Sequence, residues 1–273
     1  MSQTVDAHLQ RLIAHELRVE PGFDPEIEIE RRIEFLVERL RKAGAAGFVL
    51  GISGGVDSSV AGRLCQMAVQ RARGSGQRAR FVGMRLPYGE QFDEADAQAA
   101  LEFVAPDEVL TVDVAPAADA MLDALRETAA RPENQDFVHG NIKARQRMIA
   151  QYAVAGDRGL LVAGTDHASE AVMGFFTKHG DGACDLTPLT GLTKRRVRAL
   201  AAALGASDTL VRKLPTADLE SGRPGHPDED AFGITYDDID DFLEGKPVSA
   251  EVAETVARWH ARTAHKRALP NTP

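Results

Sequence analysis

The stretch Gly51-Ile-Ser-Gly-Gly-Val-Asp-Ser-Ser59 combines the residue types that bind phosphate. An apolar run at 48–52 enters it and a helical pattern at 58–69 leaves it, so a glycine turn joins a strand to a helix. Gly54 and Gly55 can adopt positive φ, which lets backbone N–H groups converge on one point. Serine hydroxyls and the positive end of the following helix face the same point. The stretch therefore predicts a polyphosphate site, at which Asp57 can hold the accompanying metal ion.

This stretch is not a Walker A loop, because no Gly-Lys-Ser/Thr sequence follows it. The pattern Ser-Gly-Gly-x-Asp-Ser instead resembles the pyrophosphate-binding loop of ATPases that cleave ATP between the α- and β-phosphates. The alternative is an ordinary turn between a strand and a helix that happens to be rich in Gly and Ser. Five fixed residues rarely match by chance, which favours the phosphate loop.

Polar residues also follow other expected strands. The segment 85–91 follows the expected strand 81–84, and the segment 164–170 follows the expected strand 160–163. Because parallel strands bring their carboxyl ends to one edge of a sheet, Glu170 is expected to share a Mg²⁺ ion with Asp57. Taken alone, Glu170 would be interpreted as a solvated loop carboxylate.

Lys194 begins a basic helix, 194–204, for which Thr193 is the expected N-cap and Gly205 the end. The helix dipole disfavours a cation at this position, so Lys194 is best explained if an anion also binds there. An ordinary basic helix face is the competing interpretation.

The remaining elements place these residues in an α/β fold. Alternating strands and helices predict one doubly wound, mostly parallel sheet flanked by helices, in a single domain over residues 1–273. Strands are expected at 48–52, 81–84, 109–114, 160–163 and, as a short final strand, 186–189; helices are expected at 5–17, 25–44, 58–73, 93–104, 116–130, 141–154, 194–204, 237–242 and 249–265. The two helices before the first strand cover either the sheet or a partner subunit. The segment 215–231, rich in Pro, Gly and charge, predicts a mobile loop or lid.

Composition excludes several classes of protein. The chain has 273 residues and a net charge of −9, which argues against general affinity for nucleic acid or anionic membranes. Two cysteines, Cys65 and Cys184, show no metal-ligand spacing, so a zinc site is not expected. The sequence shows neither a signal peptide nor a membrane-spanning run, so we expect a soluble cytoplasmic protein.

Several further motifs occur in one order along the chain, and together they resemble the ammonia-dependent NAD⁺ synthetase family. They follow the first loop as Arg85-Leu-Pro-Tyr-Gly89, Gly140-Asn-Ile-Lys-Ala-Arg-Gln-Arg-Met148, Gly164-Thr-Asp-His-Ala-Ser-Glu170, Gly174-Phe-Phe-Thr-Lys178, Gly180-Asp-Gly182, Pro188-Leu-Thr-Gly-Leu-Thr-Lys194, Pro215-Thr-Ala-Asp-Leu219 and His265-Lys-Arg267. The resemblance implies a Rossmann-like fold of the adenine nucleotide alpha hydrolase type. It also implies ATP-dependent amidation of deamido-NAD⁺ through an NAD-adenylate, with AMP and pyrophosphate as products. The sequence has no nitrilase-like glutaminase region, so free ammonia is the expected nitrogen donor.

The resemblance assigns roles to individual residues. Positions that match ATP contacts are Gly51, Ile52, Ser53, Gly54, Gly55, Val56, Asp57, Ser58, Arg85, Gln91, Thr165, Lys194 and Thr216. Positions that match deamido-NAD⁺ contacts are Arg145, Lys178, Asp185, His265 and Lys266. Asp57 and Glu170 match the Mg²⁺ ligands. Asp181 is expected to hold or deprotonate ammonium, although an Asp in a Gly-rich turn more often serves the turn itself.

The family resemblance further implies a homodimer with the dinucleotide site near its interface, where helices 1–45 and part of 141–155 are buried. The loops 85–91 and 215–231 are expected to close over ATP. The competing functions are another pyrophosphate-loop enzyme, such as a tRNA thiolase or an amidotransferase synthetase domain, and a non-catalytic nucleotide sensor. The acidic charge disfavours tRNA, and a sensor has no need of the polar cluster at 164–194.

Overall fold

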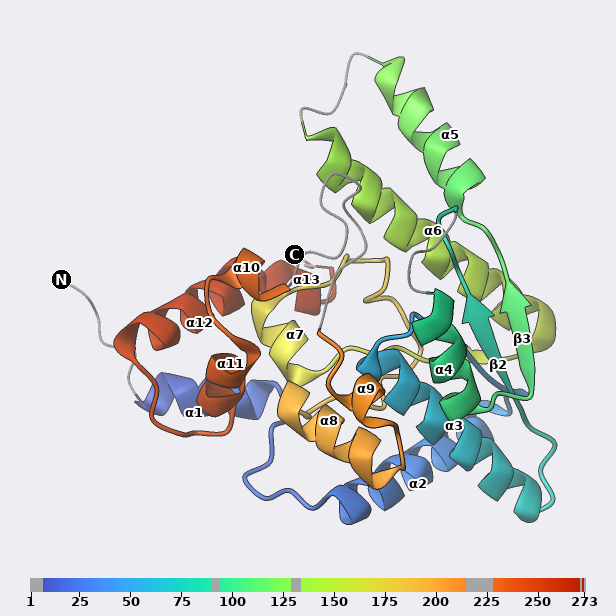
Figure 1. Cartoon of the computed structure of the whole chain (residues 1–273), viewed down its shortest axis with the longest axis horizontal. Helices are drawn as coiled ribbons and strands as arrows, with labels where there is room; N and C mark the ends of the chain where they lie inside the picture. Colours follow the sequence, from blue (N-terminus) through green and yellow to red (C-terminus); the bar gives the residue numbers. More distant parts are fainter. Residues whose placement is uncertain (1–6, 90–93, 129–133, 215–227, 271, 273) are drawn as a thin grey trace.

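Four parallel strands form the sheet at the centre of the protein (Figure 1). The structure is a computed structural model that describes residues 7–89, 94–128, 134–214, 228–270 and 272. The strands are β1 (Gly47–Gly51), β2 (Arg80–Arg85), β3 (Glu108–Thr111) and β4 (Leu161–Val162), and their order is β3-β2-β1-β4. The doubly wound parallel sheet expected from the sequence is thereby confirmed.

Helices occupy most of the remaining described chain. They are α1 (Ala7–Glu16), α2 (Pro25–Ala43), α3 (Val56–Gly74), α4 (Glu94–Val104), α5 (Ala115–Arg126), α6 (Gln135–Arg158), α7 (Ala168–Met173), α8 (Lys194–Ala203), α9 (Asp208–Val211), α10 (Asp228–Phe232), α11 (Tyr236–Leu243), α12 (Ala250–Arg262) and α13 (Ala264–Arg267). Among the described helices, none combines the length and the apolar character needed to cross a bilayer.

Side chains of β1 alternate between two hydrophobic clusters, as the two-residue period of a strand requires. Phe48 and Leu50 pack with α2, α3 and α8 on one face of the sheet. Val49 packs with residues of α6 and with Val82 and Met84 of β2 on the other face. Helices thus cover both faces and hold the strand ends in a fixed arrangement.

A further hydrophobic cluster joins α1, α7, α11 and α12. Its largest members include Met173, Tyr236 and Phe242, which are all buried. Contacts of α11 with both α7 and α8 connect this cluster to the helices beside the sheet. The amphipathic α1 therefore packs against α7, α11 and α12 rather than on the sheet. Covering the sheet, one of the two roles expected for the first helices, is confirmed for α2.

The strand order reverses between β1 and β4, because β2 and β3 extend to one side of β1 and β4 lies on the other. In open α/β sheets, ligands bind outside the carboxyl ends of the strands at such a reversal. The glycine loop follows β1 and the segment 163–170 follows β4. The fold therefore brings the two predicted carboxylate-bearing segments together.

The predicted final strand at 186–189 is wrong as a strand. Only a single parallel bridge forms there, between Ala163 and Leu186. Pro188 carries no backbone N–H and cannot extend the ladder. Its carbonyl oxygen instead accepts a hydrogen bond from Arg32 at 2.5 Å.

Gly47 offers a test of how β1 is held. Its φ is +146°, and a Cβ placed there would lie 1.8 Å from the carbonyl oxygen of Arg80 on the paired strand. We expect Gly47→Ala to lower the free energy of unfolding by about 3 kcal/mol or more, because backbone strain and a clash with main chain act together. Urea denaturation followed by circular dichroism measures this loss.

Gly22→Ala is the matched control for this change. A Cβ at Gly22 meets nothing within 4 Å. The free energy of unfolding should therefore stay within about 0.5 kcal/mol of that of the wild type. Equal stability of the two variants would contradict the close approach of β1 and β2 at Gly47.

Candidate active site

The glycine loop after β1 is braced by its serine side chains. Gly54 adopts a φ of +84°, as expected, whereas Gly55 has an ordinary φ of −85° and serves as the N-cap of α3, so the prediction of positive φ was wrong there. The backbone N–H of Ser53 donates to Oγ of Ser58 at 3.2 Å, and the hydroxyls of Ser53 and Ser58 lie 3.1 Å apart. The hydroxyl of Ser59 donates to the carbonyl of Gly55 at 2.7 Å. These bonds keep the loop in one shape at the amino end of α3.

The first two amides of the loop are also bonded within the protein. The N–H of Gly51 donates to Oε1 of Gln151 at 2.8 Å, and the N–H of Ile52 donates to the carbonyl of Met84 at 2.8 Å. Gly51 and Ile52 therefore set the direction of the loop as it leaves the sheet. Val56 begins α3, whose dipole favours an anion beside the loop.

Asp57, His167 and Glu170 form a compact cluster at the strand reversal. One ligand atom from each lies within 4.8 Å of the others. Nε2 of His167 lies 3.5 Å from Oδ1 of Asp57 and 3.5 Å from Oε1 of Glu170. Glu170 lies in the first turn of α7, where the ring nitrogen Nδ1 of His167 accepts a hydrogen bond from the N–H of Glu170 at 3.4 Å. The predicted pair of carboxylates is thus brought together.

The electrostatics of this cluster suit a divalent cation. Burial, with a smaller contribution from the Asp57 carboxylate, raises the pKa of Glu170 well above its usual value. Burial alone would also raise the pKa of Asp57, but the charge of Lys194 holds it below its usual value. Burial lowers the pKa of His167 to about 3, so its ring is neutral.

Asp57 also has a buried atom without a partner, since its Oδ1 accepts no hydrogen bond from any described residue. The carboxylates of Asp57 and Glu170, with this unpartnered oxygen of Asp57, fit Mg²⁺, which prefers oxygen ligands. The bond from the Glu170 N–H to Nδ1 of His167 leaves the proton of the neutral ring on Nε2, directed toward the carboxylates. At 3.5 Å this N–H forms no hydrogen bond with either carboxylate, and Asp57 and Glu170 are the candidate metal ligands.

Lys194 reaches the cluster from the first position of α8. The residue is only 1% exposed, and its Nζ lies 2.6 Å from Oδ2 of Asp57. The ammonium also lies 5.1 Å from the centre of the Tyr236 ring. The N-cap at Thr193 is confirmed, with its Oγ accepting from the N–H of Arg196 at 3.4 Å. A buried ammonium at this edge is placed to meet a phosphate group.

A second cluster contains four of the positions that match deamido-NAD⁺ contacts. The guanidinium of Arg145 donates to the carbonyl of Lys178 at 3.3 Å, and the ammonium of Lys178 donates to the carbonyl of His265. The ammonium of Lys266 donates to the carbonyls of Gly174 and Phe176, each at 2.8 Å. Residues near 145, 176 and 265 are thereby joined.

Arg267 adds to this connection between distant parts of the chain. One of its nitrogens donates to the carbonyl of Ala171 at 2.9 Å, and another donates to the carbonyl of His260 at 2.6 Å. Together, Lys266 and Arg267 bind main-chain oxygens within residues 171–176, at the end of α7 and just after it. We call residues 265–267 the basic clamp.

Asp185 lies apart from that cluster. Its Oδ2 accepts a hydrogen bond from the N–H of Val162 at 2.7 Å, which fixes it to the end of β4. The structure therefore shows a structural contact for Asp185 and no contact with the other described dinucleotide positions.

Asp181 accepts a hydrogen bond from the N–H of Thr177 at 2.9 Å, within a tight turn that also bonds Gly180 and Gly182 to the Thr177 carbonyl. Burial of the carboxylate raises the pKa of Asp181 above its usual value. Burial and the charge of Asp181 raise the pKa of nearby Asp166 to about 7. Asp181 thus serves its turn and also lies in a group of acids at the site.

The structure describes only two of the other four predicted ATP positions, Arg85 and Thr165. Arg85 ends β2 and is buried, and Thr165 is half-buried just after β4, so both lie at the carboxyl edge of the sheet. Gln91 and Thr216 lie outside the described residues, as do residue 90 of the loop 85–91 and residues 215–227 of the loop 215–231.

Sequence reasoning did not single out His167, Tyr236 or Asp240. His167 stands inside the quoted segment 164–170, so a signal for it was present. Tyr236 and Asp240 lie in α11, far from every motif in sequence, and only the fold brings them beside Lys194.

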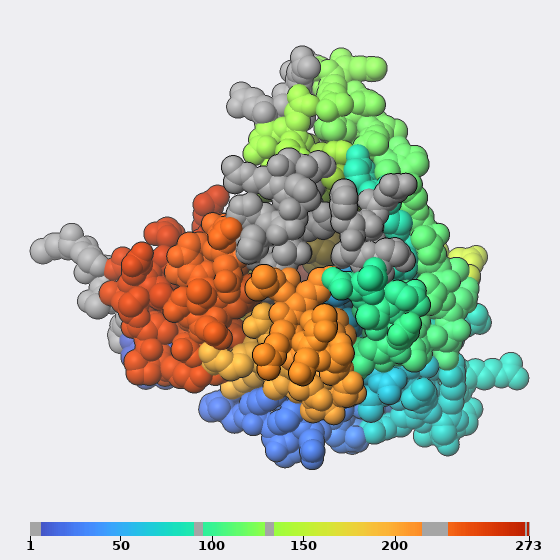
Figure 2. Space-filling view, viewed as in Figure 1, coloured from blue at the N-terminus to red at the C-terminus, as the bar shows by residue number. Residues whose placement is uncertain are grey.

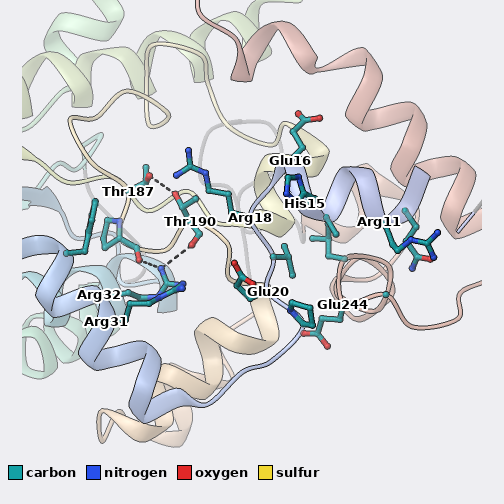
Figure 3. A pocket seen from close by; sticks show the side chains of 18 residues that line it. Arg11, His15, Glu16, Arg18, Glu20, Arg31, Arg32, Thr187, Thr190 and Glu244 are labelled. Atoms are coloured by element: carbon teal, nitrogen blue, oxygen red, sulfur yellow. Dashed lines mark hydrogen bonds between the residues drawn. The ribbon is translucent and has the colours of Figure 1, made fainter. Parts of the chain in front are cut away.

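A cavity of about 980 Å³ lies elsewhere, between α1, α2 and the turn 187–190 (Figure 3). Arg18, Arg31 and Arg32 are among its lining residues, and Arg32 donates to the carbonyls of Pro188 and Thr190. None of the described residues predicted to bind ATP, metal or dinucleotide lines it. This cavity is therefore separate from the site at the strand reversal.

Comparison with known proteins agrees with this arrangement. The sequence model of the family described as NAD synthase matches residues 28–270. A Streptomyces coelicolor protein named NH(3)-dependent NAD(+) synthetase is 64% identical over 276 residues, with 100% of both chains covered. A crystal structure of NAD⁺ synthetase from Burkholderia pseudomallei has 63% identity, covers 97% of each chain and superposes with a TM-score of 0.84. A structure of NMN synthetase from Francisella tularensis has 36% identity, a TM-score of 0.80, and covers 92% of this chain and 99% of that one.

Proposed function

The chain belongs to the NAD synthase family, and from that premise and the site at the strand reversal we infer the reaction that it catalyses. It is an enzyme that amidates deamido-NAD⁺ with ammonia in an ATP-dependent reaction. The observation that carries this function at the level of the site is the meeting of Asp57, Glu170 and Lys194 beside the glycine loop. The family assignment also decides against a tRNA thiolase, an amidotransferase synthetase domain or a nucleotide sensor.

We propose that the reaction begins with activation of the nicotinate carboxylate. A carboxylate is a poor electrophile toward ammonia, so it attacks the α-phosphate of ATP and releases pyrophosphate. Backbone N–H groups and hydroxyls of the loop 51–58 hold the departing pyrophosphate, supported by the amino end of α3. The ammonium of Lys194 lies close enough to this point to bind a phosphate oxygen. Thr165 and Arg85, at the same edge, complete the proposed ATP contacts among the described residues.

We propose that Asp57 and Glu170 hold Mg²⁺. The orphaned oxygen of Asp57 and the raised pKa of Glu170 support this assignment. When bound, the ion would offset negative charge on the phosphates.

In the second step, ammonia attacks the acyl carbon of the adenylate and AMP leaves. We propose that Asp181 takes a proton from ammonium. Burial raises its pKa, and its position beside Lys266 and Asp166 supports a carboxylate that can accept a proton at the site.

We propose that Arg145, Lys178, His265 and Lys266 bind the dinucleotide, because cationic groups suit its pyrophosphate and carboxylate. Asp185 is a weaker candidate, since its carboxylate is already bound to the amide of Val162. Gln91 and Thr216 stay proposals from the sequence for the ATP site.

Lys178→Ala tests the dinucleotide assignment. We expect the KM for deamido-NAD⁺ to rise about tenfold while the KM for ATP changes less than about twofold, because one charge-assisted contact is lost. Steady-state kinetics with each substrate varied in turn measure both constants. Arg158→Ala, which removes an ion pair with Glu108, is the control and should leave both constants unchanged. Equal changes in the two constants for Lys178→Ala would remove its assigned role.

The decisive assay supplies the protein with ATP, Mg²⁺, ammonium and deamido-NAD⁺. We expect NAD⁺ and AMP in equal amounts, and far less product when glutamine replaces ammonium. A parallel reaction with nicotinate mononucleotide tests the alternative suggested by the NMN synthetase relative. Because identity is 64% to proteins named NAD⁺ synthetase and 36% to that relative, we expect the dinucleotide to be preferred. Formation of ADP in place of AMP would contradict the proposed reaction.

We also propose a homodimer with the dinucleotide site near its interface. α5 and the start of α6 project from the rest of the protein, and Phe137 and Ile149 of α6 are 56% and 51% exposed (Figures 1 and 2). Leu12 of α1 is exposed as well. Large apolar side chains on a surface favour a protein partner, which light scattering after size-exclusion chromatography would detect. A single domain over 1–273 and a cytoplasmic location stay predictions from the sequence.

A further inference from the structure

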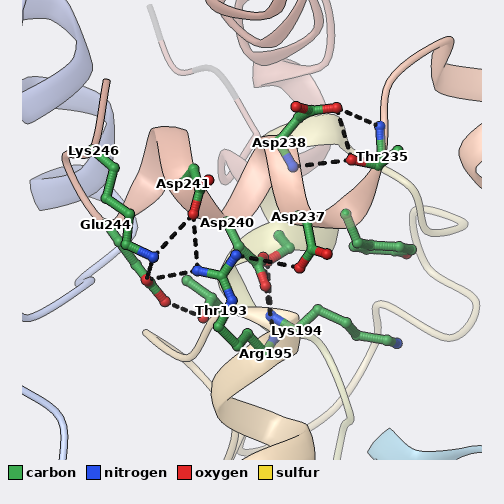
Figure 4. Close-up of polar contacts among 12 residues, drawn as sticks. Thr193, Lys194, Arg195, Thr235, Asp237, Asp238, Asp240, Asp241, Glu244 and Lys246 are labelled. Atoms are coloured by element: carbon green, nitrogen blue, oxygen red, sulfur yellow. Dashed lines mark hydrogen bonds and ion pairs between the residues drawn. The ribbon is translucent and has the colours of Figure 1, made fainter. Parts of the chain in front are cut away.

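Asp240 of α11 is a buried carboxylate that contacts two other helices (Figure 4). The residue is 1% exposed. Its Oδ2 accepts a hydrogen bond from the backbone N–H of Arg195 at 2.6 Å. Its Oδ1 accepts from the backbone N–H of Lys194 at 3.2 Å and from the hydroxyl of Ser169 at 2.6 Å. One side chain thus connects the beginning of α8 with α7.

Ser169 strengthens this connection. Its Oγ accepts a hydrogen bond from the N–H of Lys194 at 3.0 Å while its hydroxyl proton goes to Asp240. Ser169 immediately precedes Glu170 in α7. Lys194 and the residue next to Glu170, the candidate metal ligand, therefore share one hydrogen-bonded junction.

Asp240 also explains how α8 can begin with a lysine. The positive end of the helix dipole disfavours a cation at the first position of a helix. The Asp240 carboxylate lies at that end and accepts from the N–H groups of the first two residues, Lys194 and Arg195. Its negative charge offsets the positive end of the helix dipole.

Helix α11 also contacts the ammonium group at the end of the Lys194 side chain. Tyr236 lies one turn before Asp240 on α11, and residues four apart share a face. The Tyr236 ring lies 5.1 Å from Nζ of Lys194, which itself lies 2.6 Å from Oδ2 of Asp57. α11 therefore contacts Lys194 at its backbone and at its charged group.

Neighbouring acids of α11 make different contacts. Asp237 and Asp241 pair with the guanidinium of Arg195 at 3.2 and 2.9 Å, on the more exposed side of the helix (Figure 4). Asp238 completes the capping box of α11 with Thr235. Asp237, Asp238 and Asp241 make no described hydrogen bond or ion pair with Lys194. The described carboxylates of α11 therefore divide into surface partners and the buried Asp240.

We propose that Asp240 is a positioning residue that fixes Lys194 and Ser169, and through them the ammonium and Glu170, in the geometry that cleaves ATP. This inference rests on the function proposed above. Because Asp240 bonds to the backbone of Lys194 and to none of the described dinucleotide positions, its loss should reduce the rate of adenylation more than it weakens binding of deamido-NAD⁺.

Asp240→Asn tests the proposal with a side chain of nearly the same size. The amide has one acceptor oxygen, and its NH₂ group cannot accept a bond from the N–H of Arg195. We expect kcat for AMP formation to fall about 10²-fold, because a shift of about 1 Å in a catalytic group has that effect. The KM for deamido-NAD⁺ should change less than about threefold if Asp240 acts only on the adenylating groups.

A double-mutant cycle separates positioning from a general structural role. If Asp240 acts through the Lys194 ammonium, adding Asp240→Asn to a Lys194→Met protein should lower the remaining kcat less than about threefold. Asp238→Asn is the matched control on the same helix, because it changes the carboxylate that accepts from the N–H and hydroxyl of Thr235 without touching α8. It should lower the Tm by a few degrees and leave kcat unchanged.

Ser169→Ala is the second variant, which tests the junction if Asp240→Asn does not fold. It should lower kcat about tenfold, again with little further effect in the Lys194→Met protein. Folded Asp240→Asn with kcat within about threefold of the wild type would overturn the proposal, as would equal effects in the presence and absence of Lys194. If the wild type itself formed no AMP, the proposed function would fail first, and this inference with it.

Discussion

Replacement of Asp57 by asparagine is expected to lower ATP-dependent NAD⁺ formation by about 10³-fold or more. Asp57 supplies the buried oxygen that has no described hydrogen-bond partner and lies within 4.8 Å of the Glu170 ligand atom. An amide in its place provides no negative charge for Mg²⁺ or for Lys194. Product formation measured with ammonium and saturating ATP, by chromatography of AMP and NAD⁺, gives the size of the loss.

The same substitution should also affect stability. Lys194 is buried and would lose its ion-pair partner, which is costly because the remaining charge is uncompensated. We expect the free energy of unfolding to fall by up to about 3 kcal/mol, with some of the loss relieved because Asp57 is partly exposed.

Asp107→Asn is a suitable control for this loss of stability. Asp107 bonds to Arg73, Gln66 and the N–H of Phe81, away from the strand reversal. Its substitution should lower the free energy of unfolding by about 1–3 kcal/mol and leave kcat unchanged. Near-normal activity of Asp57→Asn would remove the metal assignment, whatever its stability.

Replacement of Lys194 by methionine should lower kcat for AMP formation by about 10²–10³-fold. Methionine keeps a long apolar side chain against Tyr236 but removes the positive charge that lies beside Asp57. The KM for ATP should also rise, since a phosphate contact is lost. Steady-state AMP formation at varied ATP concentration measures both effects.

Lys194→Arg is the informative companion. It restores positive charge but places a planar guanidinium where a compact ammonium lies between Tyr236 and Asp57. We expect partial recovery of the KM for ATP and little recovery of kcat. A Lys194→Met protein with kcat and KM within threefold of the wild type would contradict the assigned role.

The sequence predicted the architecture well where local patterns and topology agree. Asp24 and Gly44 bound α2 as expected, with the Asp24 carboxylate accepting from the N–H groups of Glu26 and Ile27. Other boundaries depend on neighbours in space. The segment 249–265 was expected to be one helix, but α12 ends at Arg262 and a separate short helix, α13, begins at Ala264. The hydroxyl of Thr263 bonds back to the carbonyl of Trp259 at this break.

The sequence also predicted which carboxylates meet. Asp57 and Glu170 could be paired because each follows a strand of a parallel sheet, and the strand reversal places those two ends side by side. The short helix α7 was missed, since six residues with few periodic positions give little helical signal. His167 caps that helix and lies 3.5 Å from both carboxylates, and it was missed together with the helix.

Asp240 shows why some of the site could not be predicted. Its neighbours Asp237, Asp238 and Asp241 are also acidic, and nothing in the sequence separates one from another. Burial makes the difference, because only the packing of α11 on α7 and α8 turns Asp240 toward the N–H groups of Lys194 and Arg195. The resemblance to known enzymes identifies residues that contact the substrates more readily than residues that position those contacting side chains.

The basic clamp has a consequence for the order in which the site is made on the ribosome. Lys266 bonds to carbonyls 92 and 90 residues earlier in the chain, and Arg267 bonds to one 96 residues earlier. A growing polypeptide therefore carries the glycine loop, both candidate acidic ligands and Lys194 well before the clamp has been translated. Until residue 267 emerges, the main chain at 171–176 lacks these bonds, so completion of the cluster around Lys178 and Lys266 must wait for translation of the basic clamp.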